Sequence, residues 1–303
     1  MHTTALTDLR AGLTFSTGAD FTAIGQSVLS SSLLPRDVTR RWLKPTSNTP
    51  DLRFAAGMPW EILRVDVPVP TAPSFPARLA GNDTRPARLV DLYTKNGGIG
   101  AYHAQFALSP DHGFGFVVFV AGPPAGADGR FADMMLVNRL TSETLLPAFE
   151  AAGLEQAVAR FGGTYATATG NATLTVVAGD GGLGLGVRDW RASGRDLLKS
   201  YFGALHGVPS EAIEGEPRLR LYPVGLDDGK QIAFRGVYDA LGDAAPFPNS
   251  GRPFAGACAA WASVGEPPYG NVGLDDFVFD IDAAGKATAI TARGARQVLL
   301  KQA

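Results

Sequence analysis

The sequence has almost no cysteine, since Cys258 is the only one among its 303 residues. A single cysteine excludes an internal disulfide and any metal centre built from several thiolates. The four histidines, His2, His103, His112 and His206, lack the short spacings that are typical of zinc ligands. We therefore expect neither a bound metal nor another cofactor.

Long runs of one charge and long apolar runs are also missing. The 27 basic and 29 acidic residues give a net charge of −2, so nucleic acid is not expected as a partner, because phosphate binding needs a concentrated basic surface. No apolar run reaches the ~20 residues that span a bilayer. The first residues lack the basic and apolar segments of a secretory signal. As written, the chain is expected in the cytoplasm; an extracellular location is the alternative if a longer precursor exists.

What is present predicts an α+β protein of two domains, with a boundary near residue 160. Hydrophobic residues make up 45% of the chain, enough for packed cores. In the first domain, residues 1–160, apolar residues recur at helical or alternating spacing. These patterns predict helices at 16–30, 36–43 and 130–161, the last kinked or divided at Pro147, a strand at 60–69, and three consecutive antiparallel strands within 89–122.

The second domain, residues 161–303, changes to short apolar segments separated by glycine-rich turns. Many short strands at this spacing favour an all-β barrel or sandwich. A short helix is expected within 193–205. The candidate strands are 164–169, 171–177, 183–190, 218–223, 230–239, 259–264, 275–281 and 287–291.

Lys95-Asn96-Gly97-Gly98 lies between two alternating segments of the first domain. Asn-Gly is the strongest short signal for a hairpin turn, and a lysine beside a turn is usually solvated. A lysine followed by backbone-permissive residues also suits a strand edge that binds a substrate. From these residues alone the hairpin turn is favoured over the strand edge.

The order of several segments resembles a known family. These are "GLTFSTGADFTAIGQSVLSSSLLPRDVTRRWLKP", "GMPWEILR", "VDLYTKNGGIGAYHAQFALSPDHGFGFVVFVAG" and a closing amphipathic helix. In this order they are similar to the C-terminal portion of class C type serine β-lactamase-like, penicillin-binding-protein-like proteins that carry an appended C-terminal β domain. The resemblance covers residues 1 to about 160, and more loosely the residues that follow. It implies part of a β-lactamase/transpeptidase-like antiparallel sheet with a C-terminal helix.

The resemblance also implies roles for the four residues. Lys95, Asn96 and Gly97 match the Lys-Thr/Ser-Gly triplet on the strand that borders the family's active site. Lys95 would hold a substrate carboxylate and tune proton transfer, and Asn96 would hydrogen-bond the substrate. Gly97 would let the substrate lie against the strand, and the backbone N–H of Gly98 would be an oxyanion-hole donor. The substrate class implied is an amide, ester or other acyl compound.

The family's nucleophile has no counterpart in this sequence. None of the residues three places before a lysine is serine, so the chain contains no Ser-x-x-Lys. The family's Tyr-x-Asn appears only as Tyr269-Gly270-Asn271, after the lysine triplet instead of before it. We therefore expect a truncated or degenerate serine hydrolase or acyltransferase that is not hydrolytic by itself.

Removing the nucleophile-bearing half would leave the sheet with an open edge and an uncovered apolar face. We expect a second copy, another partner or the C-terminal β domain to cover that surface; otherwise the isolated chain should fold poorly. The alternative function is a module that binds an apolar or other small molecule through its C-terminal β domain. The aromatic residues that suit such a pocket, or an ordinary core, are Tyr165, Trp190, Tyr201, Trp261 and Phe277.

Overall fold

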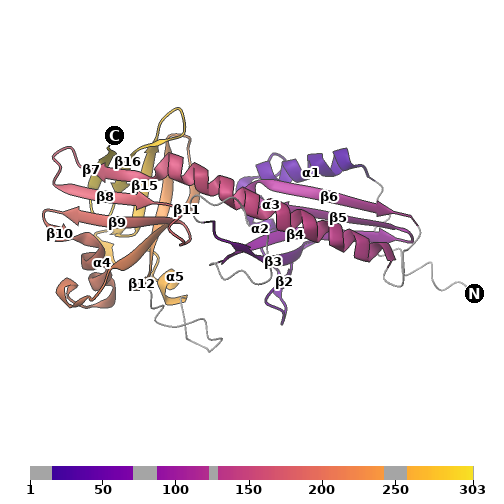
Figure 1. Cartoon of the computed structure of the whole chain (residues 1–303), viewed down its shortest axis with the longest axis horizontal. Coiled ribbons are helices and arrows are strands. Elements are labelled where there is room, and N and C mark those ends of the chain that lie inside the picture. Colours follow the sequence, from indigo (N-terminus) through magenta and orange to yellow (C-terminus); the bar gives the residue numbers. More distant parts are fainter. Residues whose placement is uncertain (1–15, 71–86, 123–128, 242–257, 303) are drawn as a thin grey trace, which may run out of the picture. The chain divides into compact units, whose positions relative to one another are not determined.

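The computed structural model describes residues 16–70, 87–122, 129–241 and 258–302. The described residues form two units, each around its own sheet (Figure 1). The first unit contains residues 16–69 and 87–151, and the second begins at Ala152. The predicted α+β class is thus confirmed. No helix among the described residues is both long enough and apolar enough to cross a membrane.

The first unit is built on a six-stranded antiparallel sheet whose strands follow one another in chain order. The three strands predicted within 89–122 are confirmed as β4, β5 and β6, and the strand predicted at 60–69 as β3. A 3-10 turn, η2 (Pro110–His112), joins β5 to β6. The strands are β1 (Ser47–Asn48), β2 (Phe54–Ala56), β3 (Glu61–Pro68), β4 (Ala87–Ile99), β5 (Tyr102–Ser109) and β6 (Phe114–Ala121).

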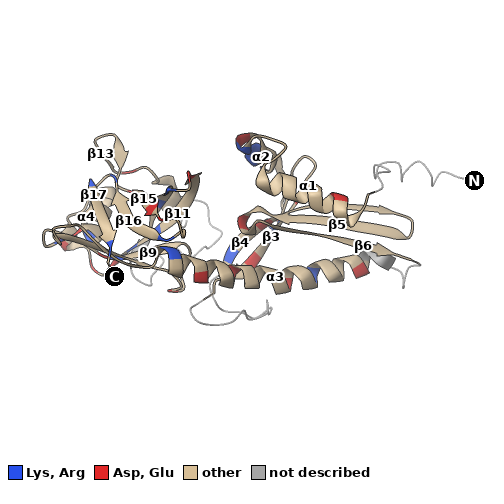
Figure 2. Ribbon diagram, turned by 90° about the horizontal axis from the view of Figure 1, so that it is seen from above, with Lys and Arg blue, Asp and Glu red and all other residues tan. Residues whose placement is uncertain are grey.

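Helices cover both faces of this sheet (Figure 2). The helix α1 (Gly18–Ser30) begins at Thr17, whose side chain accepts a hydrogen bond from the Asp20 N–H in a capping box. With α2 (Arg36–Trp42), α1 covers an aromatic-rich cluster that includes Trp60, Ile62 and Phe106.

The opposite face holds a smaller cluster of Val67, Val90 and Leu92, packed against Leu146 of α3 (Gly129–Phe161). Neighbouring residues of a strand point to opposite faces, so Ile62 and Leu63 serve different clusters. Of the two outcomes expected at Pro147, a kink or a division, the division was wrong, because α3 runs continuously through Pro147 into the second unit.

The second unit is an eight-stranded antiparallel barrel, closed by the pairing of β8 with β9. The short β10 (Arg195–Asp196) pairs with β9, and the expected helix is α4 (Leu197–His206), followed by η3 (Ser210–Ala212). A two-stranded hairpin stands apart, formed by β13 (Pro268–Tyr269) and β14 (Val272–Gly273). The barrel strands in spatial order are β9 (Leu185–Ala192), β11 (Pro217–Asp227), β12 (Gln231–Leu241), β15 (Asp276–Ile281), β16 (Ala287–Ala292), β17 (Gln297–Lys301), β7 (Gly163–Ala166) and β8 (Ala172–Val177).

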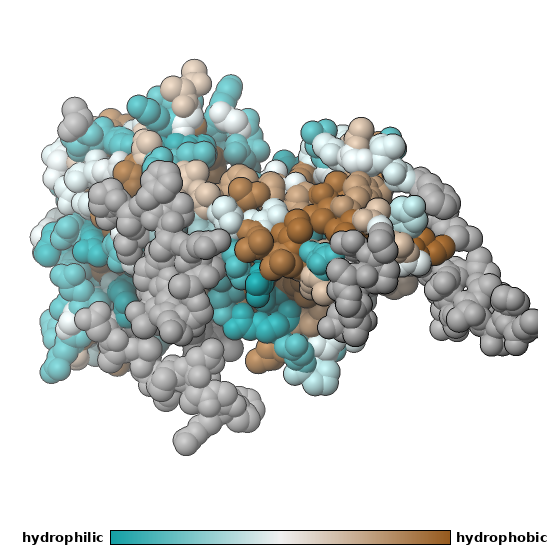
Figure 3. Space-filling model, turned by 45° about the vertical axis from the view of Figure 1, so that its right-hand side comes forward, coloured by the Kyte–Doolittle hydropathy of each residue, from teal (hydrophilic) through white to brown (hydrophobic). Residues whose placement is uncertain are grey.

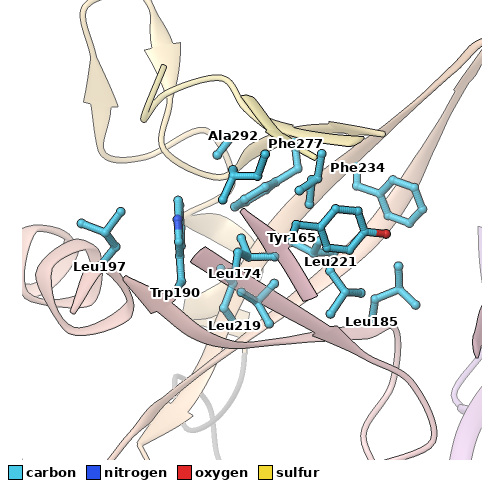
Figure 4. Packing of buried hydrophobic residues seen from close by; sticks show 14 of the residues in the cluster. Tyr165, Leu174, Leu185, Trp190, Leu197, Leu219, Leu221, Phe234, Phe277 and Ala292 are labelled. Carbon is cyan, nitrogen blue, oxygen red and sulfur yellow. The ribbon is translucent and has the colours of Figure 1, made fainter. Parts of the chain in front are cut away.

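Large side chains fill the interior of the barrel (Figure 4). Tyr165, Trp190, Phe277 and Phe279 are all completely buried. The Trp190 and Phe277 rings meet edge to face with centroids 5.4 Å apart, which is a favourable aromatic geometry. These rings make the hydrophobic core of the unit.

Two expectations for the second unit need correction. The segment 259–264, expected as a strand, lies partly in a helix, α5 (Cys258–Ala262). A short apolar run does not distinguish a strand from a helix, and here the helix forms. The strand β17, which closes the barrel beside β7, was not expected at all.

Candidate functional site

The strand β4 continues past the end of its neighbour β3. The pairing of the two strands ends at Glu61 opposite Thr94. Beyond that point, Lys95 to Ile99 pair only with β5 on the other side. Lys95-Asn96-Gly97-Gly98 therefore lies within a strand with one open edge among the described residues, and the turn comes at Gly100 and Ala101. The hairpin-turn interpretation of these four residues was wrong.

Backbone groups of β4 point toward this open edge at alternate residues. The Asn96 N–H points there, because it donates to the Glu61 carboxylate at 3.1 Å. Two residues later in an extended strand, the Gly98 N–H points the same way, beyond the end of β3. The edge thus presents the backbone donor of Gly98 toward the side that β3 leaves open.

A charged pair lies at the start of the open edge. The Lys95 Nζ donates to Glu61 Oε1 at 2.5 Å and to the Asn96 carbonyl at 3.0 Å. The Lys95 side chain is 45% exposed and that of Glu61 is 27% exposed. The lysine is therefore accessible to solvent. Its ammonium group and the Asn96 N–H both donate hydrogen bonds to the Glu61 carboxylate.

The two glycines meet different surroundings. A Cβ atom on Gly97 would have no atom within 4 Å, so the fold does not need glycine there. A Cβ on Gly98 would lie 2.6 Å from His103 Nδ1, so that face is covered by the imidazole. The space over Gly97 leaves room for a ligand to lie against the strand.

Exposed apolar side chains lie on the same face as Gly97. Ile99 follows on β4, Tyr102 is its partner on β5, and Phe119 pairs with the Ala104 that stands opposite Gly97. Tyr102 is 64% exposed and Phe119 50% exposed. Figure 3 shows apolar residues in brown gathered on an exposed face of the first unit. These side chains form a partly exposed apolar border beside the open edge, and Phe119 also packs against Phe21 of α1.

A second constellation in the first unit has the connectivity of a proton relay. The Ser109 hydroxyl lies 2.7 Å from His112 Nδ1, and His112 Nε2 lies 2.7 Å from Glu150 Oε1. The Arg88 Nε donates to the same oxygen at 2.7 Å, and Arg88 Nη1 donates to Asp111 at 2.8 Å. Serine, imidazole and carboxylate in this order are the elements of nucleophilic catalysis.

Burial argues against catalysis by this relay. Ser109 is only 1% exposed and the His112 side chain 5%, and the tilted Phe149 ring lies 5.9 Å from the imidazole, centroid to centroid. Burial alone would raise the pKa of Glu150, but the hydrogen bond from His112 and the charge of Arg88 outweigh it and lower that pKa. The network therefore connects η2 and β4 to α3. Its hydrogen bonds also pair the buried charge of Glu150, which would be costly without a partner.

A pocket of about 200 Å³ lies beside β9, β11 and α4. Asp180 lines this pocket, and its carboxylate accepts hydrogen bonds from Arg220 at 2.6 Å and from Arg188 at 3.1 Å. Burial would raise the pKa of Asp180, but these two arginines lower it. The Arg220 guanidinium lies against Gly182 and Gly186, where a Cβ would overlap it. Within the described residues, no group of three or more His, Cys, Asp or Glu side chains is placed to hold a metal ion.

The predicted site residues lie together because they are consecutive, but their partner was not predicted. Glu61 reaches Lys95 and Asn96 from the first residue of β3. No local pattern reveals this contact, since it depends on where the β3–β4 pairing stops. The Ser109–His112 segment looked like a plain turn, and its bond to Glu150 was equally invisible.

Comparisons with known proteins agree with this picture of the fold. The family described as "Beta-lactamase-like-like, C-terminal domain" matches residues 153–303. The "Beta-lactamase-like protein" of Arthroderma benhamiae is 26% identical over 299 residues, covering 91% of this chain and 46% of that protein. The chain thus spans about half the length of this curated relative. The match to a β-lactamase-like C-terminal domain thus falls on the second unit.

Solved structures give a weaker likeness. The octameric penicillin-binding protein homologue from Pyrococcus abyssi is 14% identical, with 91% of this chain and 43% of that chain covered and a TM-score of 0.24. SurE with D-Leu is 14% identical, with 95% and 50% covered and a TM-score of 0.26. At these TM-scores the likeness carries no argument.

Proposed function

We propose that the chain is a truncated or degenerate β-lactamase-related serine hydrolase or acyltransferase that is not hydrolytic by itself. The observation that carries the proposal is the open edge of β4, with Lys95 and the Gly98 N–H beside it, in a chain without Ser-x-x-Lys. The binding half of an acyl-transfer site is retained, and the attacking group is not.

The chemistry of the edge supports binding of an acyl compound. An exposed ammonium group attracts a substrate carboxylate, and a backbone N–H at an open edge donates a hydrogen bond to a carbonyl oxygen of an extended ligand. The open space over Gly97 admits such a ligand. Without a nucleophile, these groups position a substrate but do not cleave it.

Covalent labelling tests the proposal. The full chain is incubated with a fluorophosphonate and, separately, with benzylpenicillin, and its intact mass is measured. We expect no adduct with either reagent. The variant Ser109→Ala is the control for the buried relay. An adduct of the wild type that disappears in this variant would show that Ser109 attacks, and any adduct at all would refute the proposal.

The proposal that the chain is truncated rests on the coverage of its curated relative, of which it matches 46%. Reading the transcript upstream of the Met1 codon tests it. We expect an in-frame Ser-x-x-Lys and Tyr-x-Asn there. A stop codon before Met1 would leave degeneration as the explanation, and co-purification of a separate Ser-x-x-Lys polypeptide would indicate complementation.

The alternative function, ligand binding by the barrel unit, has one observation in its favour. Aromatic residues fill the interior of the barrel. The pocket beside β9 and β11 is lined by Arg188, Arg218 and Arg220 together with Asp180 and Glu216. Such a group of arginines suits a small anion. Titration of the full chain with inorganic phosphate, followed by hydrogen exchange over 180–188 and 216–220, tests this. Protection confined to these segments would favour the alternative function.

A further inference from the structure

Glu61 occupies the edge of β4 in the way that an anionic ligand would. One carboxylate oxygen accepts from Lys95 Nζ at 2.5 Å, and the other accepts from the Asn96 N–H at 3.1 Å. These are the first side-chain cation and the first backbone donor beyond the end of β3. An incoming carboxylate would need the same two groups, so Glu61 and the ligand compete for them.

The backbone of Glu61 is fixed while its carboxylate is exposed. Glu61 pairs with Ala56 on one side and Thr94 on the other, and the buried Thr94 hydroxyl donates to its carbonyl at 2.7 Å. Just before it, Trp60 is buried in the aromatic cluster. The side chain can therefore rotate into solvent without moving the strand.

The contact is also weak enough to be displaced. Ion pairs between side chains this exposed contribute little, because water and salt screen them and both side chains lose rotamer freedom. A ligand with its own carboxylate can replace the hydrogen bonds of Glu61 to Lys95 and Asn96. Further contacts along Gly97 and Gly98 would then favour the ligand over the Glu61 side chain.

We propose that Glu61 is an internal competitor of this site, a side-chain gate whose carboxylate stands in for that of the ligand and limits binding at the β4 edge. This inference rests on the proposed function of the edge. The gate discriminates between ligands, because it disfavours weak anions and neutral compounds and yields to a carboxylate that makes further contacts with the strand.

The test compares Glu61→Gln with the wild-type chain. The probe is acetyl-alanyl-alanine with a free carboxylate, and its C-terminal amide is the neutral counterpart. Binding is followed by calorimetry and by the amide NMR shifts of Asn96 and Gly98. The matched control is Asp66→Asn, which removes a negative charge from the same strand at a residue paired with Arg53 instead of Lys95. Glu61→Ala is the second variant.

We expect both Glu61 variants to bind the acid about two- to sixfold more tightly than the wild type, the range that a competing ion pair this weak can hold back, and Asp66→Asn to bind it as the wild type does. Lys95→Gln added to Glu61→Gln should abolish the preference for the acid over the amide. If the wild type binds the acid and the Glu61 variants bind it equally well or more weakly, the gate is refuted, but the proposed ligand site still stands. An equal gain in Asp66→Asn would overturn it too, since net charge would then suffice. Absence of binding in every variant would remove both the gate and the proposed function.

Discussion

Replacing Glu150 by alanine should destabilise the first unit by about 3 kcal/mol. Glu150 is 14% exposed and accepts hydrogen bonds from His112 and Arg88. Removing one partner of a buried charge pair typically costs about 3–5 kcal/mol, because the other charge stays buried. The lower end applies here, since Arg88 is 26% exposed and keeps its bond to Asp111.

Hydrogen exchange of peptides from β4, β5 and β6, read by mass spectrometry, measures this loss in the first unit separately from the barrel. The matched control is Glu143→Ala on the same helix. Glu143 lies 3.8 Å from Arg139 with both side chains partly exposed, so its loss should change stability by less than about 0.5 kcal/mol. A loss below about 1 kcal/mol for Glu150→Ala, or an equal loss in the control, would refute the assignment of Arg88–Glu150–His112 as a stabilising network.

The same carboxylate predicts a dependence on pH. The folded state lowers the pKa of Glu150, so the unfolded chain binds its proton more readily. Its contribution to stability is therefore complete above the ordinary glutamate pKa of the unfolded chain and is lost as the pH falls through the lower pKa of the folded state. In Glu150→Gln this acid-dependent loss should disappear from the first unit. An unchanged acid profile would place the titration on another group.

Three further substitutions give expected outcomes. Gly97→Ala should leave the free energy of unfolding within about 0.5 kcal/mol of the wild type in a urea titration, since its Cβ enters open space, while weakening binding of the dipeptide acid. Gly294→Ala should cost about 2 kcal/mol or more, because its Cβ would lie 2.5 Å from the Gly273 carbonyl; a neutral result would mean that this turn can shift. Phe279→Ala should cost about 3–5 kcal/mol in the barrel, because Phe279 is fully buried; a smaller loss would mean that the aromatic core closes over the cavity.

Much of the first unit could be predicted because its local signals agree with its tertiary structure. The helical spacing of apolar residues predicted α1, and apolar segments within 89–122 predicted β5 and β6. The segment 259–264 failed because it is apolar without a period. Pro147 failed as a helix breaker because packing of the helix on both sides outweighs one missing hydrogen bond.

The candidate site divides in the same way. Its residues on β4 were predicted, because they are consecutive and resemble a family triplet. Glu61 was not predicted as a site residue. Its contact with β4 depends on where the pairing of β3 with β4 ends, and only the strand register shows that. The open edge itself is therefore a property of pairing, which no single segment of sequence encodes.

The passage of α3 through both units has a consequence for how the protein unfolds. Pro147 has no N–H, so the carbonyl of Glu143 lacks its usual partner four residues later, close to where the first unit ends at Ala151. The helix is thus weakest within one turn of the place where its supporting core changes. A pulling force or a protease should open the chain there first, leaving the barrel with its own length of helix intact.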